Sequence, residues 1–142
     1  MDKLRTEIIT LANYADTSKD GKLSISGVFD EIFVDKFPAQ FARGFLVFTV
    51  SGGEPNSQHE LKVQIVGPKG ESIINKEFSV TTGRKGKGNF IIQLVGMPLP
   101  SKGDYKISVS LGKRIIGETM LYITPSNSNG KEENPSQLHP VN

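Results

Sequence analysis

Short runs of alternating apolar and polar residues, separated by turns that contain glycine or proline, recur along most of the chain. In "ELKVQIVG" (60–67) the apolar positions are Leu61, Val63 and Ile65, and "YKISVSL" (105–111) alternates in the same way. A period of two places alternate side chains on opposite faces of a strand. The pattern predicts an all-β fold: a single antiparallel β-sandwich of about eight strands, of the immunoglobulin-like or a related Greek-key type.

Two strand boundaries follow from the same pattern. "GKLSISGVFDEIFV" (21–34) is expected to form one strand, with Leu23, Ile25 and Phe29 on one face. "MPLPSKGD" (97–104) is expected to form a loop, because its prolines and glycine interrupt the alternation.

The length and composition favour one domain followed by a tail. The chain has 142 residues with 36% hydrophobic residues and eight Phe, which suits a soluble domain with a real core. From Pro125 onward, "PSNSNGKEENPSQLHPVN" has almost no apolar residues, so it cannot offset its ordering entropy. We therefore expect a β-sandwich domain over residues 1–124 and a disordered tail over residues 125–142.

The N-terminus and the cysteine content point to the cytoplasm. The opening "MDKLRTEIITLANYA" lacks the apolar core of a signal peptide, and no segment has the apolar length of a membrane helix. The chain has no cysteine, which removes disulfides and thiolate metal sites and mildly favours a reducing compartment. The formal net charge of +2 gives no whole-molecule argument for nucleic acid or membrane binding.

The stretch "DTSKDGKLSISG" (16–27) is similar to a calcium-binding loop but is also typical of a hairpin turn. Asp16, Ser18 and Asp20 match ligand positions of a calcium loop. However, Gly27 stands where the loop needs a glutamate that supplies two oxygens, and the residues after it have strand periodicity. The hairpin is therefore the better interpretation, and no metal site is predicted.

The hairpin interpretation also predicts a register. A three-residue loop over 19–21, with Gly21 in the left-handed conformation, places Ser18 opposite Lys22. One face then pairs Leu11 with Phe29, Ala15 with Ile25 and Thr17 with Leu23, and the other face pairs Tyr14 with Ser26 and Asp16 with Ser24. The first face is mostly apolar and the second is polar.

Two segments carry a family resemblance: Tyr14-Ala15, Asp20-Gly21-Lys22-Leu23, Gly27, Phe29-Asp30 and Ile32, and later "GMPLPSKGDY" (96–105). These residues resemble the signatures of a family of short uncharacterised prokaryotic proteins. The resemblance implies a small β-sandwich and brings no assigned activity, so it transfers no catalytic residue.

Tyr105 opens an alternating strand directly after a corner that contains glycine. This placement is similar to the tyrosine corner of Greek-key sandwiches, in which the hydroxyl bonds to the backbone a few residues upstream. The alternative is a tyrosine that only fills the core.

No set of residues typical of catalysis is present, and we expect no enzyme activity and no cofactor. There is no nucleophile elbow, and His59 in "HELKV" lacks the second histidine of a zinc protease motif. His59 is expected at the surface. Asp35 and Asp104 are expected in loops, and Asp30 and Glu31 are expected on opposite faces of a strand.

The loop "GRKGKGN" (83–89) is the one candidate binding segment. A Walker loop needs Lys-Ser or Lys-Thr opening a helix, whereas Asn89 and a strand follow here. What remains is a flexible loop. Its backbone amides and the side chains of Arg84, Lys85 and Lys87 are expected to hold an anion or a nucleic-acid phosphate, and the alternative is a loop that is only solvated.

Three hypotheses about function follow. The first is a non-catalytic protein-interaction module with an unidentified protein partner, which binds through loops or a strand edge. The second is an anion or nucleic-acid binder that uses Arg84, Lys85 and Lys87. An enzyme built from loop carboxylates is the weakest, and an exposed edge strand also offers a route to a homodimer.

Overall fold

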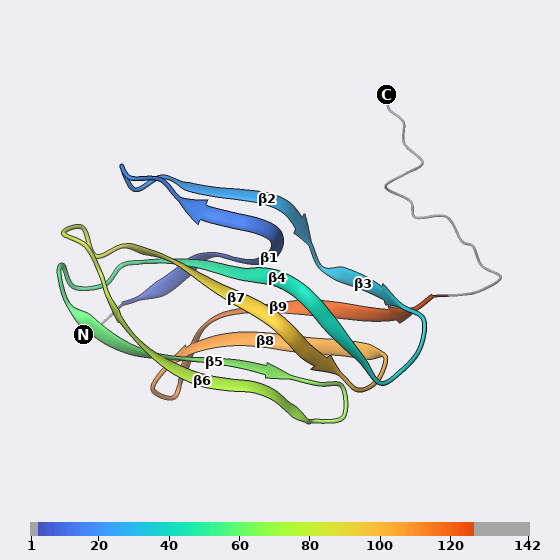
Figure 1. Cartoon of the computed structure of the whole chain (residues 1–142). Helices are drawn as coiled ribbons and strands as arrows, with labels where there is room; N and C mark the ends of the chain where they lie inside the picture. The colour runs from blue at the N-terminus through green and yellow to red at the C-terminus, as the bar shows by residue number, and fades with distance from the viewer. Residues whose placement is uncertain (1–2, 127–142) are drawn as a thin grey trace.

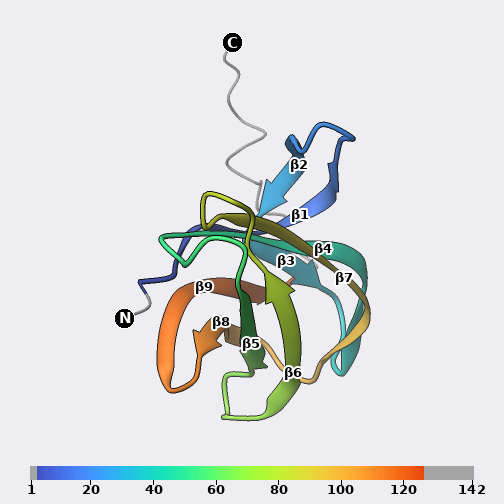
Figure 2. The ribbon, with the colours of Figure 1, turned by 90° about the vertical axis from the view of Figure 1, so that its left-hand side faces the viewer.

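The computed structural model describes residues 3–126, which form two β-sheets packed face to face (Figures 1 and 2). One sheet has the order β2-β1-β4-β7, from Leu23–Phe29, Arg5–Thr17, Ala39–Ser51 and Gly88–Leu99. The other has the order β3-β9-β8-β5-β6, from Glu31–Val34, Arg114–Pro125, Gly103–Leu111, Gln58–Val66 and Ser72–Thr81. The predicted all-β sandwich is confirmed, with nine strands in this part of the chain.

The core lies between the sheets and is built by the alternating segments. Leu61 and Ile65 of β5 and Ile107 of β8 are fully buried, and Val63 is nearly so, as the alternation predicts. Phe48 of β4 meets them from the facing sheet. Burying one such side chain contributes roughly 1.5–3 kcal/mol, so the inner faces of the two sheets hold the sandwich together. The described residues contain no helix long and apolar enough to cross a membrane.

The tyrosine corner is present. Tyr105 is fully buried, and its hydroxyl donates a 2.6 Å hydrogen bond to the carbonyl oxygen of Ser101. The backbone N–H of Ser101 in turn donates to the Tyr105 hydroxyl at 3.2 Å. Both groups belong to Ser101, four residues upstream, so Tyr105 holds the corner that leads into β8 and does more than fill space.

The prediction of a single strand over 21–34 is wrong. The chain leaves one sheet after Phe29 and joins the other at Glu31, where β3 pairs in parallel with β9. The N–H of Tyr122 donates a 2.7 Å hydrogen bond to the carbonyl of Asp30 at this crossover. The switch lets Ile32 and Val34 pack on the core from the second sheet, which a continuous strand would not allow.

The expected loop over 97–104 is shorter than predicted. β7 continues to Leu99, with Met97 and Leu99 buried and Pro98 exposed. Proline lacks a backbone N–H. It is tolerated here because β7 is an edge strand, in which an N–H on the open side has no strand to bond to. Asp104 also lies in β8, opposite Tyr122, and not in a loop.

The C-terminal strand passes the predicted domain boundary. β9 ends at Pro125, and the N–H of Ser126 donates a 2.8 Å hydrogen bond to the carbonyl of Val34. The sandwich therefore includes the first residues of the segment predicted as a tail. The rest of that segment lies outside the described residues.

Candidate binding groove

The β1–β2 hairpin has the predicted register. Leu11 pairs with Phe29, Ala15 with Ile25 and Thr17 with Leu23, and the polar pairs also agree. Gly21 has φ +84°, and the N–H of Ser18 donates a 2.9 Å hydrogen bond to the carbonyl of Lys22. The stretch that is similar to a calcium loop is therefore a three-residue hairpin turn.

The hairpin bends away from the sheet that it belongs to. In Figure 2, β2 and the end of β1 stand on the side of the four-stranded sheet that faces away from β5 and β8. The bend lies at Gly27, which has φ +70°, and at Asn13 across from it. A Cβ atom on Gly27 would lie 2.6 Å from Asn13 Nδ2, so β1 and β2 approach each other closely where the hairpin bends.

Outward-facing residues of β4 are buried next to this hairpin. Leu46 and Phe48 point into the core, so the alternating residues Val47 and Thr49 point outward. Val47 is nevertheless fully buried and Thr49 is 8% exposed. Tyr14 of the hairpin also contacts Phe45 of β4 edge-on, with ring centroids 5.8 Å apart. The hairpin thus forms a partial third layer over the outer face.

An open groove of about 680 Å³ lies between this layer and the sheet. Four strands, the loop after β4 and the turn before β7 contribute to its lining: Arg5, Glu7, Ile8, Leu23, Ile25, Thr49, Val50, Ser51, Gly52, Lys87 and Asn89. We call this site the hairpin groove. Its aliphatic side chains come mainly from β1 and β2, and Ile8 is 42% exposed.

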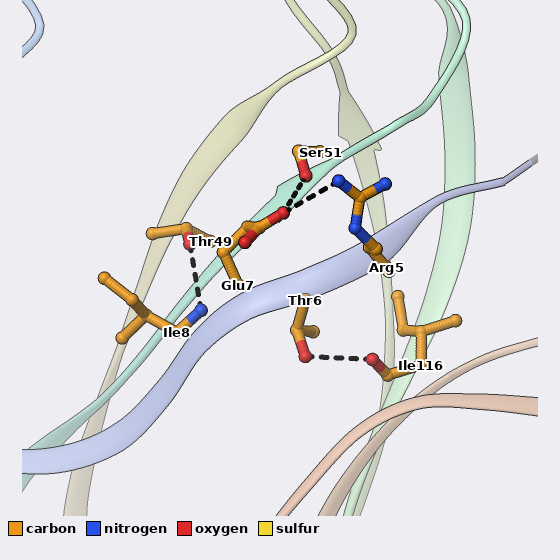
Figure 3. A network of polar contacts seen from close by, with 7 residues as sticks. All are labelled: Arg5, Thr6, Glu7, Ile8, Thr49, Ser51 and Ile116. Atoms are coloured by element: carbon orange, nitrogen blue, oxygen red, sulfur yellow. Dashed lines mark hydrogen bonds and ion pairs between the residues drawn. The ribbon is translucent and has the colours of Figure 1, made fainter.

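A polar network lies along β1 at one side of the hairpin groove (Figure 3). Glu7 is the extra residue of a β-bulge, since Thr6 pairs with Val50 and Ile8 pairs with Thr49. Its carboxylate accepts a 2.5 Å hydrogen bond from the Ser51 hydroxyl and forms a 3.1 Å ion pair with Arg5.

These contacts lower the pKa of Glu7 below its ordinary value of 4.5. The Ser51 hydroxyl is the main cause, because it bonds the charged form, and the Arg5 guanidinium is the next. Lys87 adds a smaller attraction in the same direction. The carboxylate therefore stays charged in the groove at neutral pH.

Two further bonds anchor this part of β1. The N–H of Ile8 donates to the Thr49 hydroxyl at 3.2 Å. The Thr6 hydroxyl donates to the carbonyl of Ile116, in β9 of the opposite sheet, at 2.9 Å (Figure 3). The bulge is thus fixed to both sheets, and the bulged residue presents its side chain to the groove.

The basic loop is a tight turn and not an open loop. The N–H of Gly83 donates to the carbonyl of Lys87, and the N–H of Gly86 donates to the carbonyl of Gly83, both at 2.9 Å. The loop after β4 binds to it as well, since the N–H of Asn56 donates to Gly83 at 2.9 Å. Two of the amides expected to hold an anion are therefore already used within the turn.

The structure separates the three predicted cations. Lys87 lines the hairpin groove, whereas Arg84 and Lys85 do not. All three side chains are exposed. Only Lys87 therefore joins a site formed by other elements.

Comparison with protein families identifies the chain. A family model matches residues 7–124, which span all nine strands except the ends of β1 and β9. The chain belongs to DUF6941, a family of unknown function. The expected membership of an uncharacterised family is thereby confirmed at that level. A search of curated proteins gives no match.

Solved structures similar to this DUF6941 chain share little sequence with it. The alkylpurine DNA glycosylase AlkC from Pseudomonas fluorescens matches with a TM-score of 0.51 and 12% identity, over 87% of this chain and 31% of that one. β-Glucosidase 3B from Thermotoga neapolitana matches with a TM-score of 0.49 and 9% identity, over 87% and 16%. An immunoglobulin-like protein from Pseudomonas aeruginosa matches with a TM-score of 0.43 and 15% identity, over 85% and 96%.

These likenesses concern the fold alone. The DUF6941 chain spans about a third of the length of the glycosylase and about a sixth of the glucosidase.

His59 of this DUF6941 domain is not at the surface, contrary to the sequence prediction. It is 7% exposed, and its Nε2 lies 3.0 Å from the Ser57 hydroxyl. His59 lies two residues before Leu61 and pairs with Val80, so its side chain projects from the same inward face of β5 as Leu61. The buried face of β5 therefore begins at His59 and not at Leu61.

The carboxylates do not gather into a cluster. Among residues 3–126, no three His, Asp or Glu side chains are placed as metal ligands would be. Glu31 accepts a 2.6 Å hydrogen bond from the Thr124 hydroxyl, and Asp20 forms a 3.8 Å ion pair with Lys22. Both roles are local to a strand pair or a turn.

Sequence reasoning missed most of the hairpin groove. Arg5, Glu7, Ile8 and Ser51 lie on two strands that are about 40 residues apart in the chain, so no local motif joins them. The one available signal was Gly27, a glycine inside a strand pattern, which often marks a bend or a close backbone approach.

Proposed function

We propose that this DUF6941 domain is a non-catalytic protein-interaction module and that the hairpin groove is its binding site. The observation that carries the proposal is the hairpin folded over the outer face of its own sheet. A sandwich without this layer would present an ordinary solvated face there. The layer instead leaves an open groove of about 680 Å³, a size in the usual range for ligand sites.

The lining supports a protein partner in preference to a polar metabolite. Ile8, Leu23 and Ile25 offer aliphatic surface, and Arg5, Glu7 and Lys87 offer charges beside it. An aliphatic floor with a charged margin is typical of protein interfaces, in which apolar contacts are surrounded by polar ones. Ile8 is the central contact in this proposal, because it remains 42% exposed among the residues that line the groove.

The alternative function, an anion or nucleic-acid binder at the 83–89 loop, has weaker support. Arg84 and Lys85 are exposed at the tip of the turn and are free to meet a phosphate. However, Lys87 lies apart from them in the hairpin groove, and the Gly83 and Gly86 amides are occupied. Two lysine or arginine side chains on a turn give only a small electrostatic footprint.

Affinity capture from native cells with three baits tests the proposal. The baits are the natural chain, an Ile8→Glu variant in the groove, and an Arg84→Ala/Lys85→Ala variant at the tip of the turn. The proposal expects one protein partner that Ile8→Glu loses and the tip variant keeps. Thermal unfolding of each bait shows whether the variants remain folded.

Other outcomes decide against the proposal. A partner kept by both variants would place the interface elsewhere. Nucleic acid recovered with the natural chain and lost with the tip variant would favour the alternative. That binding would also weaken steeply with rising salt concentration.

A further inference from the structure

We propose that the hairpin groove takes an extended peptide, which adds as an antiparallel strand to the open edge of β2 and carries an acidic side chain toward Lys87. This inference rests on the proposed function and names the chemistry of the partner. Three features support it: the backbone of β2, the hairpin groove next to β2, and the charged side chains at the margin of the groove.

The backbone of β2 offers hydrogen-bonding groups at specific positions. The bond from the Ser18 N–H to the Lys22 carbonyl makes these two residues a hydrogen-bonded pair. Such pairs alternate with non-bonded pairs along an antiparallel ladder. With the constant register of this hairpin, Ser24 and Ser26 point their backbone groups toward β1, and Leu23 and Ile25 point theirs to the open edge.

The same two residues line the groove with their side chains. Directly opposed residues of paired strands project their side chains onto the same face of the sheet. Partner residues that exchange hydrogen bonds with Leu23 and Ile25 would therefore send their own side chains into the groove. The lining there includes Ile8, which is 42% exposed, so aliphatic side chains spaced two residues apart fit best.

The other long edge strands carry features that block strand addition. β7 contains Pro98 and also Gly96, whose φ of +66° breaks the extended backbone. β6 carries Lys76, which lies opposite the buried Val63 and so points inward from an edge. Inward charges, prolines and kinks are the usual protection of sheet edges. Residues 23–26 of β2, "LSIS", have none of these.

The charges at the groove select an acidic residue. Arg5 is paired with Glu7, but Lys87 forms no ion pair with any residue in the described part of the chain. The carboxylate of Glu7 already has Ser51 and Arg5 as partners. Arg5, Glu7 and Lys87 together carry a net charge of one positive unit, which favours an acidic side chain on the peptide. The antiparallel direction matches the pairing of β2 with β1 and of β1 with β4.

Selection from a displayed library of random short peptides tests the inference. On the natural chain, we expect enriched peptides with aliphatic residues at alternating positions and an aspartate or glutamate at one end. On a Lys87→Glu variant, the enriched acidic residue should change to lysine or arginine. Enrichment of unrelated sequences, no exchange of charge, or no enrichment over an Ile8→Glu control would overturn the inference.

Amide hydrogen exchange then locates the bound strand. Binding of an enriched peptide should slow exchange at Leu23 and Ile25 and leave Ser24 and Ser26 unchanged, since these already bond to β1. A Leu23→Pro variant, which removes an outward N–H, should bind at least about tenfold more weakly than Leu23→Ala, which keeps it. Equal affinities, or protection elsewhere, would rule out strand addition.

The two proposals fail separately. If the capture experiment finds a protein whose binding needs Ile8 while no peptide protects β2, the interaction module stands and the strand-addition mode is wrong. If neither is found, both are wrong.

Discussion

Gly86 and Gly53 approach so closely that a Cβ atom on Gly86 would lie 2.1 Å from the carbonyl oxygen of Gly53. The Gly53 N–H also donates a 3.2 Å hydrogen bond to the carbonyl of Gly86. The backbones of the two loops at this end of the sandwich are thus in direct contact. Lys87 follows directly, so its place in the hairpin groove depends on this contact.

A Gly86→Ala substitution should therefore destabilise the domain strongly. Gly86 has φ +72°, and a left-handed alanine costs about 1–2 kcal/mol by itself. The clash with Gly53 should add about 1–3 kcal/mol to the loss in unfolding free energy, as overpacking does. Urea unfolding measures the total.

Gly70→Ala is the matched control. Gly70 has φ +84° in a turn with the same hydrogen-bonding pattern, and a Cβ atom there meets nothing within 4 Å. It should show the conformational cost alone. Equal losses for the two variants would mean that the contact with Gly53 has no energetic weight.

A Tyr105→Phe substitution should remove the clamp at the start of β8. The variant leaves the Ser101 carbonyl and N–H without their partner in a buried corner, which costs about 1–3 kcal/mol. Tyr122→Phe is the control, because Tyr122 is 39% exposed, and it should change stability by less than about 0.5 kcal/mol. Chemical denaturation of both variants checks the difference, and a neutral Tyr105→Phe would contradict it.

The Glu7 carboxyl should titrate below 4.5, and Ser51→Ala should raise its pKa more than Lys87→Ala does. A pKa that is lowered in the folded state stabilises the fold above the unfolded pKa. That contribution is lost as the pH falls through the folded value. The stability difference between the natural chain and Glu7→Gln should therefore be full at neutral pH and shrink below 4.5.

Carbon-detected NMR titration of the Glu7 side chain measures this pKa directly. Natural chain, Ser51→Ala and Lys87→Ala are titrated side by side. An unchanged midpoint in Ser51→Ala would show that the hydroxyl does not hold the carboxylate.

A Gly27→Ala substitution should loosen the hairpin without unfolding the sandwich. Gly27 has φ +70°, and its added methyl would meet the Asn13 side chain, so a cost of about 1–3 kcal/mol falls on the bend. Amide exchange over residues 14–26 should speed up while β5 and β8 stay protected.

Two further variants test the cause. Gly21→Ala has a similar backbone strain at φ +84° but open space, so it should affect only the turn. Adding Asn13→Ala to Gly27→Ala should restore part of the protection, because it removes the clashing side chain. If the double variant exchanges as fast as Gly27→Ala, the contact with Asn13 is not the cause.

Local pattern was enough to predict most of the strands and one complete register. The alternation of Leu61, Val63 and Ile65 fixes which face of β5 is inward, and Gly21 fixes the hairpin turn. Both depend on residues adjacent in sequence, where side-chain period and turn chemistry act directly. The corner at Tyr105 was foreseen for the same reason.

The features that the sequence pattern missed depend on contacts between distant residues. The switch of sheet at Asp30 depends on the pairing of β3 with β9, which lets Ile32 and Val34 pack on the core. The fold-back at Gly27 needs the outer face of β4 beneath it. Neither appears in a pattern that reports one strand at a time.

The groove and the exit of the chain lie at opposite ends of β9. Leu4, next to Arg5, accepts a 3.0 Å hydrogen bond from Arg114 at the start of that strand, whereas the chain leaves the sandwich at Ser126 beyond its end (Figure 1). Twelve residues of strand span roughly 40 Å. The domain is in this respect a rigid spacer, because cargo tethered after Ser126 starts about one strand length away from Arg5 at the margin of the hairpin groove.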